Sequence, residues 1–161
     1  MERLNLLDRI LIINPARRGL AEWACMVIVG IAGLFFSWPT IPWMPYVNIF
    51  GALLFGLGLL LHIFCEKTHK QAHENSEHIH TIVTTGLYAK VRHPIYLSLI
   101  MMDIGLGLIF GIVAVIVLAL IFSYLWILTA LTEEKFLLQK FPNIYRQYMQ
   151  EVKCRLIPNF F

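Results

Sequence analysis

The chain has 161 residues, of which 58% are hydrophobic and only 14% are charged. Soluble domains average about 25% charged residues, so the composition excludes an ordinary soluble domain and predicts a single integral membrane unit. The net charge of +3 is modest and gives no reason to expect a nucleic-acid partner. Cys25, Cys65 and Cys154 form no CxxC pair, so neither a disulfide framework nor a thiolate metal site is expected.

Residues 1–20 form the first predicted element. Four apolar residues between positions 4 and 11 fall on one helical face, which predicts a short interfacial helix, with a disordered leader as the alternative. Asp8 and Arg9 interrupt this apolar stretch, and no small-residue cleavage site follows it. The segment is therefore not typical of a cleaved signal peptide.

Three apolar blocks follow along the chain. Residues 21–38 and 47–65 are each about as long as one membrane-spanning helix, which needs about 20 residues. Residues 95–132 are about twice that length, with Asp103 as their single charge and a glycine at position 111. We therefore expect an all-α protein with two spans between 21 and 65 and a short transmembrane hairpin over 95–132 that turns near Gly111.

Basic residues set the expected orientation. All 13 lysines and arginines lie before the first block, between the second and third blocks, or after the third. Residues 39–46 and the turn near Gly111 contain none. The positive-inside rule then predicts a multi-pass membrane protein with four spans and both termini in the cytoplasm.

Two cytoplasmic segments hold most of the polar chemistry. Residues 66–94 begin as a helical extension, turn at Thr84-Thr85-Gly86 and reach Pro94, which suits the first position of the third spanning helix. Residues 133–161 begin with Glu133-Glu134 and are expected to form one or two amphipathic helices. The predicted topology brings both segments to the same membrane face, where they are expected to build one site.

The stretch from His80 to Tyr96, HTIVTTGLYAKVRHPIY, carries the most specific pattern. With the GLG after it, the acidic pair Glu133-Glu134 and an FxxxY-xxY-xxxxxR-xxP tail, it resembles the isoprenylcysteine carboxyl methyltransferase and phospholipid methyltransferase superfamily. Members are integral-membrane enzymes that use S-adenosylmethionine. The resemblance covers about residues 73–161, over half of the chain, whereas the first two spans carry no motif.

The resemblance implies a cofactor pocket at the cytoplasmic face. Its members would be His80, Thr81, Ile82, Val83, Tyr88, His93, Pro94, Ile95, Tyr96, Gly105, Gly107, Glu133 and Glu134. On chemical grounds, the two glutamates are expected to pair with the cofactor's ammonium or bond its ribose hydroxyls. Arg92 or a backbone N–H is expected to bind the cofactor's carboxylate. Tyr88 and Tyr96 are expected to pack on adenine or to face the sulfonium cation.

Three positions depart from the superfamily pattern. Ser98 stands where the RHPxYxG form has glycine, and Pro142 stands where FG is usual before the tail tyrosine. Thr129 stands where the isoprenylcysteine branch tends to have an arginine for the substrate carboxylate. This last departure weighs against a prenylcysteine acceptor.

The expected acceptor is a lipid or another lipophilic small molecule. The intramembrane Asp103, the GxG element at Gly105 and Gly107, and the missing arginine favour a phospholipid amine over an isoprenylcysteine-type carboxylate. A small thiol is a further alternative. A protonated amine must lose a proton before it accepts a methyl group, so it needs a base. Asp103, His93 and Glu134 are the candidate catalytic residues.

Each motif also has a non-catalytic interpretation. Arg92 and His93 are compatible with anchors in the headgroup layer. The acidic pair is compatible with a solvated helix start, and Gly105 and Gly107 are compatible with close helix packing. His69 and His73 share a helix face, but no HExxH motif or cysteine supports them, so no metal site is expected. A non-enzymatic scaffold or small transporter would explain the spans but not the convergence of polar residues on one face.

Overall fold

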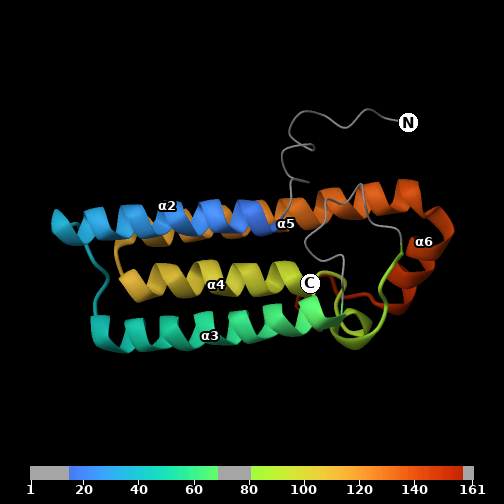
Figure 1. The fold of residues 1–161 in the computed structure, drawn as a ribbon, viewed down its shortest axis with the longest axis horizontal. Coiled ribbons are helices and arrows are strands. Elements are labelled where there is room, and N and C mark those ends of the chain that lie inside the picture. The colour runs from blue at the N-terminus through green and yellow to red at the C-terminus, as the bar shows by residue number, and fades with distance from the viewer. Residues whose placement is uncertain (1–14, 69–80, 158–161) are drawn as a thin grey trace.

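The computed structural model describes residues 15–68 and 81–157, and these ranges fold as helices (Figure 1). The helices are α2 Pro15–Phe35, α3 Met44–Thr68, the short 3₁₀ helix η2 Gly86–Ala89, α4 Pro94–Phe110, α5 Val113–Lys140 and α6 Pro142–Glu151. The expected all-α class is confirmed for these residues. Residues 1–14 of the predicted interfacial helix lie outside the described residues. Residues 15–20 of that prediction belong to the start of α2.

Three of the helices, α2, α3 and α5, are long and apolar enough to cross a membrane. Helix α4 is shorter, with 17 residues, which corresponds to about 26 Å of helix against an apolar bilayer core of about 30 Å. Figure 1 shows α4 running alongside the other three. The four-span topology and the cytoplasmic termini remain predictions.

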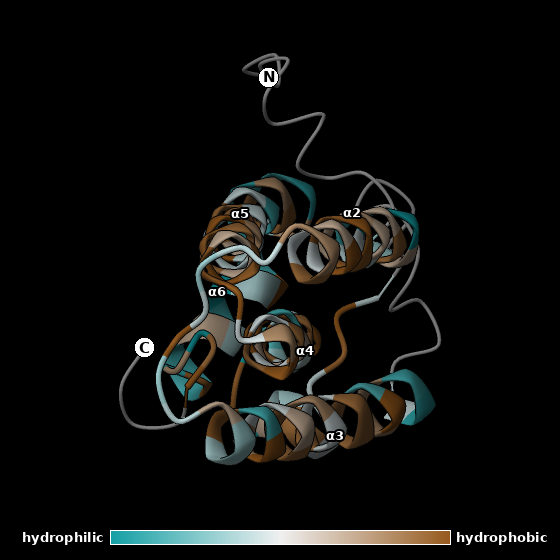
Figure 2. Cartoon of the chain, turned by 90° about the vertical axis from the view of Figure 1, so that its left-hand side faces the viewer, coloured by the Kyte–Doolittle hydropathy of each residue, from teal (hydrophilic) through white to brown (hydrophobic). Residues whose placement is uncertain are grey.

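Helix α4 occupies the centre of the bundle. Viewed along the helices, it has α3 on one side and α2 and α5 on the other (Figure 2). It packs most extensively on α3, because glycines allow the two backbones to touch. A methyl group added at Gly105 would lie 2.6 Å from the backbone nitrogen of Phe55, and one at Gly51 would lie 2.8 Å from the carbonyl oxygen of Gly105. Small residues commonly permit such close packing in membranes.

The turn between α4 and α5 lies at the predicted position. Gly111 has a φ of 62° and caps α4 in the left-handed conformation that glycine adopts without strain. Its carbonyl accepts a hydrogen bond from the Ile41 amide at 2.9 Å, which ties the turn to the α2–α3 connection. Trp43 and Tyr46 are each 78% exposed, as expected for interfacial aromatic side chains.

The start of α4 also agrees with the sequence, but the end of α5 does not match the expected segment boundary. Pro94 is the first residue of α4, as predicted. Helix α5 does not end at residue 132 but continues to Lys140, because glutamate, lysine and leucine are good helix formers. The acidic pair therefore lies inside a long helix and does not begin one. Pro142 then starts α6, which folds back at this end of the bundle (Figure 1).

Candidate functional site

Charged side chains gather at the end of the bundle where α4 begins. Arg92 and His93 precede α4, Glu133 and Glu134 lie on α5, and Arg155 follows α6. We call these five residues the charge cluster. The segment after α6 is held against the α4 start by backbone hydrogen bonds from Arg92 N to Cys154 O at 3.0 Å and from His93 N to Arg155 O at 2.9 Å. The fold thus joins three segments that are distant in sequence.

Glu134 is the centre of this cluster. Its Oε1 accepts a hydrogen bond from Arg92 Nε at 2.8 Å and lies 3.2 Å from His93 Nε2. Its Oε2 accepts hydrogen bonds from Arg155 Nε at 3.1 Å and Nη2 at 3.0 Å. Both carboxylate oxygens are therefore engaged by protein donors, which favours a positioning role over the expected direct bond to a cofactor.

Arg92 is equally committed to the protein. Besides Glu134, its guanidinium donates through Nη1 to the carbonyl oxygens of Val152 at 2.8 Å and Lys153 at 2.9 Å. Arg92 and His93 are both buried, so neither is an exposed anchor in the headgroup layer. These hydrogen bonds make Arg92 hold the segment after α6 against the start of α4. The expected role of Arg92 as the partner of a cofactor carboxylate stays a prediction.

His93 lies between the two glutamates. Its Nδ1 is 3.5 Å from Glu133 Oε2, and its Nε2 faces Glu134. Burial lowers the pKa of His93, but the hydrogen bonds and negative charges of both carboxylates raise it more, so the net pKa lies above its ordinary value. The raised pKa favours the protonated imidazole, which makes His93 a less suitable general base in this arrangement.

The raised pKa of His93 predicts a pH dependence of stability. In the unfolded chain a histidine titrates near pH 6.5, so the stabilisation from protonated His93 is complete below that pH and is lost as the pH rises through the higher folded-state pKa. We expect the thermal unfolding midpoint of the detergent-solubilised protein to fall as the pH rises above 6.5. His93→Gln should flatten this dependence, and an equally steep curve for that variant would contradict the assignment.

Tyrosine residues of η2 and α6 lie beside the charge cluster. The buried Tyr148 hydroxyl donates to the Tyr88 carbonyl oxygen at 2.6 Å, which fastens α6 onto η2. Ile82 packs against the apolar group that includes Tyr145 and Tyr148. Of the other expected pocket residues, Thr81 is exposed and Val83 is half-buried. His80 and the further histidines at 69, 73 and 78 lie outside the described residues.

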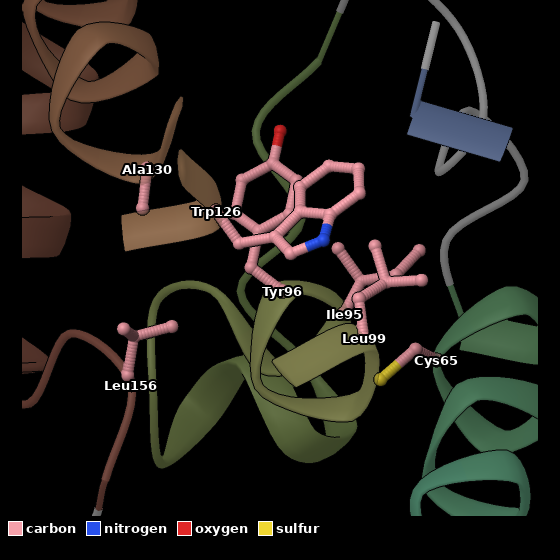
Figure 3. Packing of buried hydrophobic residues seen from close by; sticks show 7 residues of the cluster. All are labelled: Cys65, Ile95, Tyr96, Leu99, Trp126, Ala130 and Leu156. Carbon is pink, nitrogen blue, oxygen red and sulfur yellow. The ribbon is translucent and has the colours of Figure 1, made fainter. Parts of the chain in front are cut away.

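Aromatic rings lead from the charge cluster into the bundle. The His93 ring stacks on Tyr96 at 5.5 Å between centroids, and Tyr96 stacks on Trp126 of α5 at 5.7 Å. Figure 3 shows Tyr96 and Trp126 packed with Ile95, Leu99 and residues of α3 and α5. The expected pocket residues Pro94, Ile95 and Tyr96 are therefore brought beside the cluster, with Tyr96 in direct contact with His93.

Gly105 and Gly107 lie further along α4. Gly105 contacts the α3 backbone, and a methyl group added at Gly107 would lie 2.9 Å from the side chain of Ala119 on α5. Helix packing accounts for both glycines, and their cofactor-binding role stays a prediction.

A second polar group lies within the spanning helices, and of its members only Asp103 and Thr129 were singled out from the sequence. It consists of Arg18, Glu22 and Trp23 on α2, Asp103 on α4, and Trp126 and Thr129 on α5. We call it the intramembrane cluster. Its sequence signals are Asp103, the single charge of the third apolar block, and an arginine–glutamate pair at positions i and i+4 at the edge of the first block.

Hydrogen bonds tie the intramembrane cluster together. Arg18 donates through Nε to Glu22 Oε1 at 2.8 Å and through Nη1 to Thr129 Oγ1 at 2.6 Å. The guanidinium also lies 4.0 Å from the Trp126 ring centroid. Thus a guanidinium supplied by α2 lies beside position 129, and the preference for an amine over a carboxylate acceptor stays a prediction.

Comparison with known proteins adds an independent observation. Residues 46–144 match the family model described as phospholipid methyltransferase. The chain is 29% identical over 149 residues to the cobalt-zinc-cadmium resistance protein CzcN of Cupriavidus metallidurans, covering 90% of this chain and 64% of that protein. It is 30% identical over 92 residues to the protein-S-isoprenylcysteine O-methyltransferase of Schizosaccharomyces pombe, covering 56% of this chain and 36% of that protein. The chain thus spans less than two thirds of the length of either relative.

Proposed function

The chain belongs to the phospholipid methyltransferase family, and from that premise we propose that it transfers a methyl group from S-adenosylmethionine to a lipid or lipophilic acceptor. We place the reaction at the cytoplasmic membrane face. The observation that carries this proposal is the charge cluster, in which the acidic pair of α5 and the buried start of α4 meet beside an aromatic stack. This arrangement agrees with the superfamily resemblance and with the family match, which both include the start of α4 and the acidic pair.

The charge cluster fits the cofactor through its polar and aromatic groups. The side chain of Glu133 is 12% exposed and that of Glu134 is 6% exposed, so we take Glu133, the more accessible of the two, as the better partner for a cofactor ammonium. Arg155, 21% exposed, is better placed than the buried Arg92 to meet a cofactor carboxylate. Tyr96 and His93 present stacked rings next to these charges.

The cofactor and the protein residues have separate roles in the proposed methyl transfer. When bound, the cofactor supplies a methyl group on a sulfonium sulfur; the acceptor's lone pair bonds the methyl carbon while the carbon–sulfur electron pair stays on sulfur. Glu133 binds the ammonium, and Arg92, His93 and Glu134 hold the cluster rigid. Because the protein fixes the direction of attack and excludes water, orientation alone can remove several kcal/mol of the barrier.

The acceptor class is left open by the charge cluster. A carboxylate is already an anion and needs no base, whereas an amine must lose a proton. The raised pKa of His93 favours its protonated form and Glu134 is engaged by protein donors, so neither serves readily as that base, and Asp103 is the remaining candidate. A small thiol acceptor would be indicated only by a thioether product in the experiments below. A non-enzymatic scaffold would be indicated only by the absence of cofactor binding.

Calorimetric titration with S-adenosylmethionine tests the proposed function. We expect saturable binding by the purified protein and at least a tenfold weaker Kd for Glu133→Gln, equivalent to about 1.4 kcal/mol. Glu151→Gln, which alters an exposed carboxylate on α6, serves as the matched control and should bind like the unmodified protein. Absence of binding by the unmodified protein would refute the enzymatic proposal.

Product analysis then identifies the acceptor. The protein is incubated with isotopically labelled cofactor and total membrane lipid, and methylated products are separated by mass spectrometry. A labelled amine, a methyl ester and a thioether distinguish the three acceptor classes.

A further inference from the structure

Tyr145 of α6 carries a buried hydroxyl group that has no hydrogen-bond partner within the described part of the chain. The residue is 1% exposed. Tyr148, one turn further along the same helix, differs in this respect because its hydroxyl group donates to the Tyr88 carbonyl oxygen at 2.6 Å. A buried polar group without a partner costs free energy. The Tyr145 hydroxyl group therefore indicates a polar partner that comes from outside the chain.

The Tyr145 side chain lies against the charge cluster. It belongs to the buried apolar group that includes Leu137 and Val152. Leu137 is one helical turn beyond the acidic pair on α5, and the Val152 carbonyl oxygen accepts the hydrogen bond from Arg92 Nη1 at 2.8 Å. Burial raises the pKa of the Tyr145 hydroxyl group, the carboxylates of the acidic pair raise it further, and Arg92 lowers it. The phenol thus lies within electrostatic range of the cluster and keeps its hydrogen, so it is available as a donor.

The charges of the cluster indicate which group would accept this hydrogen bond. Arg92, His93 and Arg155 supply three positive charges when His93 is protonated, the form that its raised pKa favours. Glu133 and Glu134 supply at most two negative charges. The five residues of the cluster therefore have a surplus of positive charge, which favours an anionic partner. A hydroxyl donor beside surplus positive charge suits a carboxylate, because hydrogen bonds to ionised acceptors are short and strong.

We propose that the Tyr145 hydroxyl group, together with Arg155, binds the carboxylate of S-adenosylmethionine. This inference rests on the proposed function and adds a cofactor-binding residue on α6. The ammonium and the carboxylate of the cofactor are borne by the same carbon atom, so the residues that bind them must lie close together, as Tyr145 and Glu133 do. The superfamily resemblance gives Tyr145 no role, and the residue lies just beyond residues 46–144 that match the family model.

Two phenylalanine substitutions on α6 separate this role from a structural one. Tyr145→Phe removes a hydroxyl group that has no protein partner, so the thermal unfolding midpoint of the cofactor-free protein should stay constant or rise. Tyr148→Phe removes the hydrogen bond to the Tyr88 carbonyl oxygen, so its midpoint should fall. A fall for Tyr145→Phe as large as that for Tyr148→Phe would overturn the proposal, because the Tyr145 hydroxyl group would then have a partner within the protein.

Calorimetric titration of the full chain in detergent measures the binding effect. The ligands are S-adenosylmethionine and its decarboxylated form, which differ only in the carboxylate. Tyr145→Phe should weaken the Kd for S-adenosylmethionine at least tenfold and should leave the Kd for the decarboxylated form within about twofold of that of the unmodified protein. Tyr46→Phe makes the same chemical change at an exposed position near the start of α3, and it should bind both ligands like the unmodified protein.

Two results of the titration would overturn the proposal. Tyr145→Phe could bind S-adenosylmethionine with the Kd of the unmodified protein, or it could lose affinity equally for both ligands, in which case its hydroxyl group does not bind the carboxylate. Failure of the proposed function has a different signature, because the unmodified protein then binds no S-adenosylmethionine. Failure of this inference leaves binding by the unmodified protein intact.

Discussion

Replacing Glu134 with glutamine is expected to lower the free energy of unfolding by about 3 kcal/mol or more. Glu134 is the shared counter-charge of Arg92, His93 and Arg155 within hydrogen-bonding distance. Removing one partner of a buried ion pair costs about 3–5 kcal/mol, because the remaining charge stays buried without compensation. The same change releases the segment after α6 from α5, so cofactor binding should be lost as well.

Thermal unfolding in detergent, followed by circular dichroism, measures the stability effect, and calorimetry measures the binding effect. Glu151→Gln is the matched control, since its carboxylate is exposed and removing its charge should change the midpoint little. If Glu134→Gln unfolds at the temperature of the unmodified protein yet loses cofactor binding, Glu134 contacts the cofactor directly and its positioning role is wrong.

Gly105→Ala should cause the second large loss of stability. The added methyl group would lie 2.6 Å from Phe55 N and 2.9 Å from Gly51 O, and these are backbone atoms that cannot rotate away. Helices α3 and α4 must therefore separate. Overpacking of this kind costs about 3 kcal/mol at the upper end, while alanine recovers about 1 kcal/mol of helix propensity over glycine, so we expect a net loss of about 2 kcal/mol.

Gly56→Ala provides the control for this prediction. Gly56 lies on α3, and a methyl group added there meets nothing within 4 Å in the described part of the chain. It gains helix propensity without a clash, so its unfolding midpoint should stay constant or rise. Equal midpoints for the two alanine variants would show that α3 and α4 are not packed backbone to backbone.

Local backbone chemistry made several elements predictable from the sequence. Pro94 begins α4 because its fixed φ and missing amide suit the first helical turn. Gly111 ends α4 because it adopts a left-handed conformation without steric cost. Both of these inferences needed only a short window of sequence. The superfamily resemblance, now supported by the family match, rested instead on the order and spacing of motifs over about residues 73–161.

The relative roles of the two glutamates were not predictable. Both follow the last apolar block, and the sequence treats them as one acidic pair. Only the packed structure shows Glu134 enclosed by Arg92, His93 and Arg155, while Glu133 faces His93 with a more exposed side chain. One residue of helix is a rotation of about 100°, so the two carboxylates point to different surroundings that depend on distant segments.

Sequence alone determined the class of the protein, its apolar segments, two helix boundaries and the motif beside the acidic pair. The tertiary structure decided which helix faces meet, and hence that Arg18 of α2 reaches Thr129 of α5 and that Trp23 bonds Asp103. In a soluble helix the buried face is marked by its apolar stripe. In a membrane-spanning helix the lipid-facing side is as apolar as the packed side, so the sequence carries little signal for which residues meet.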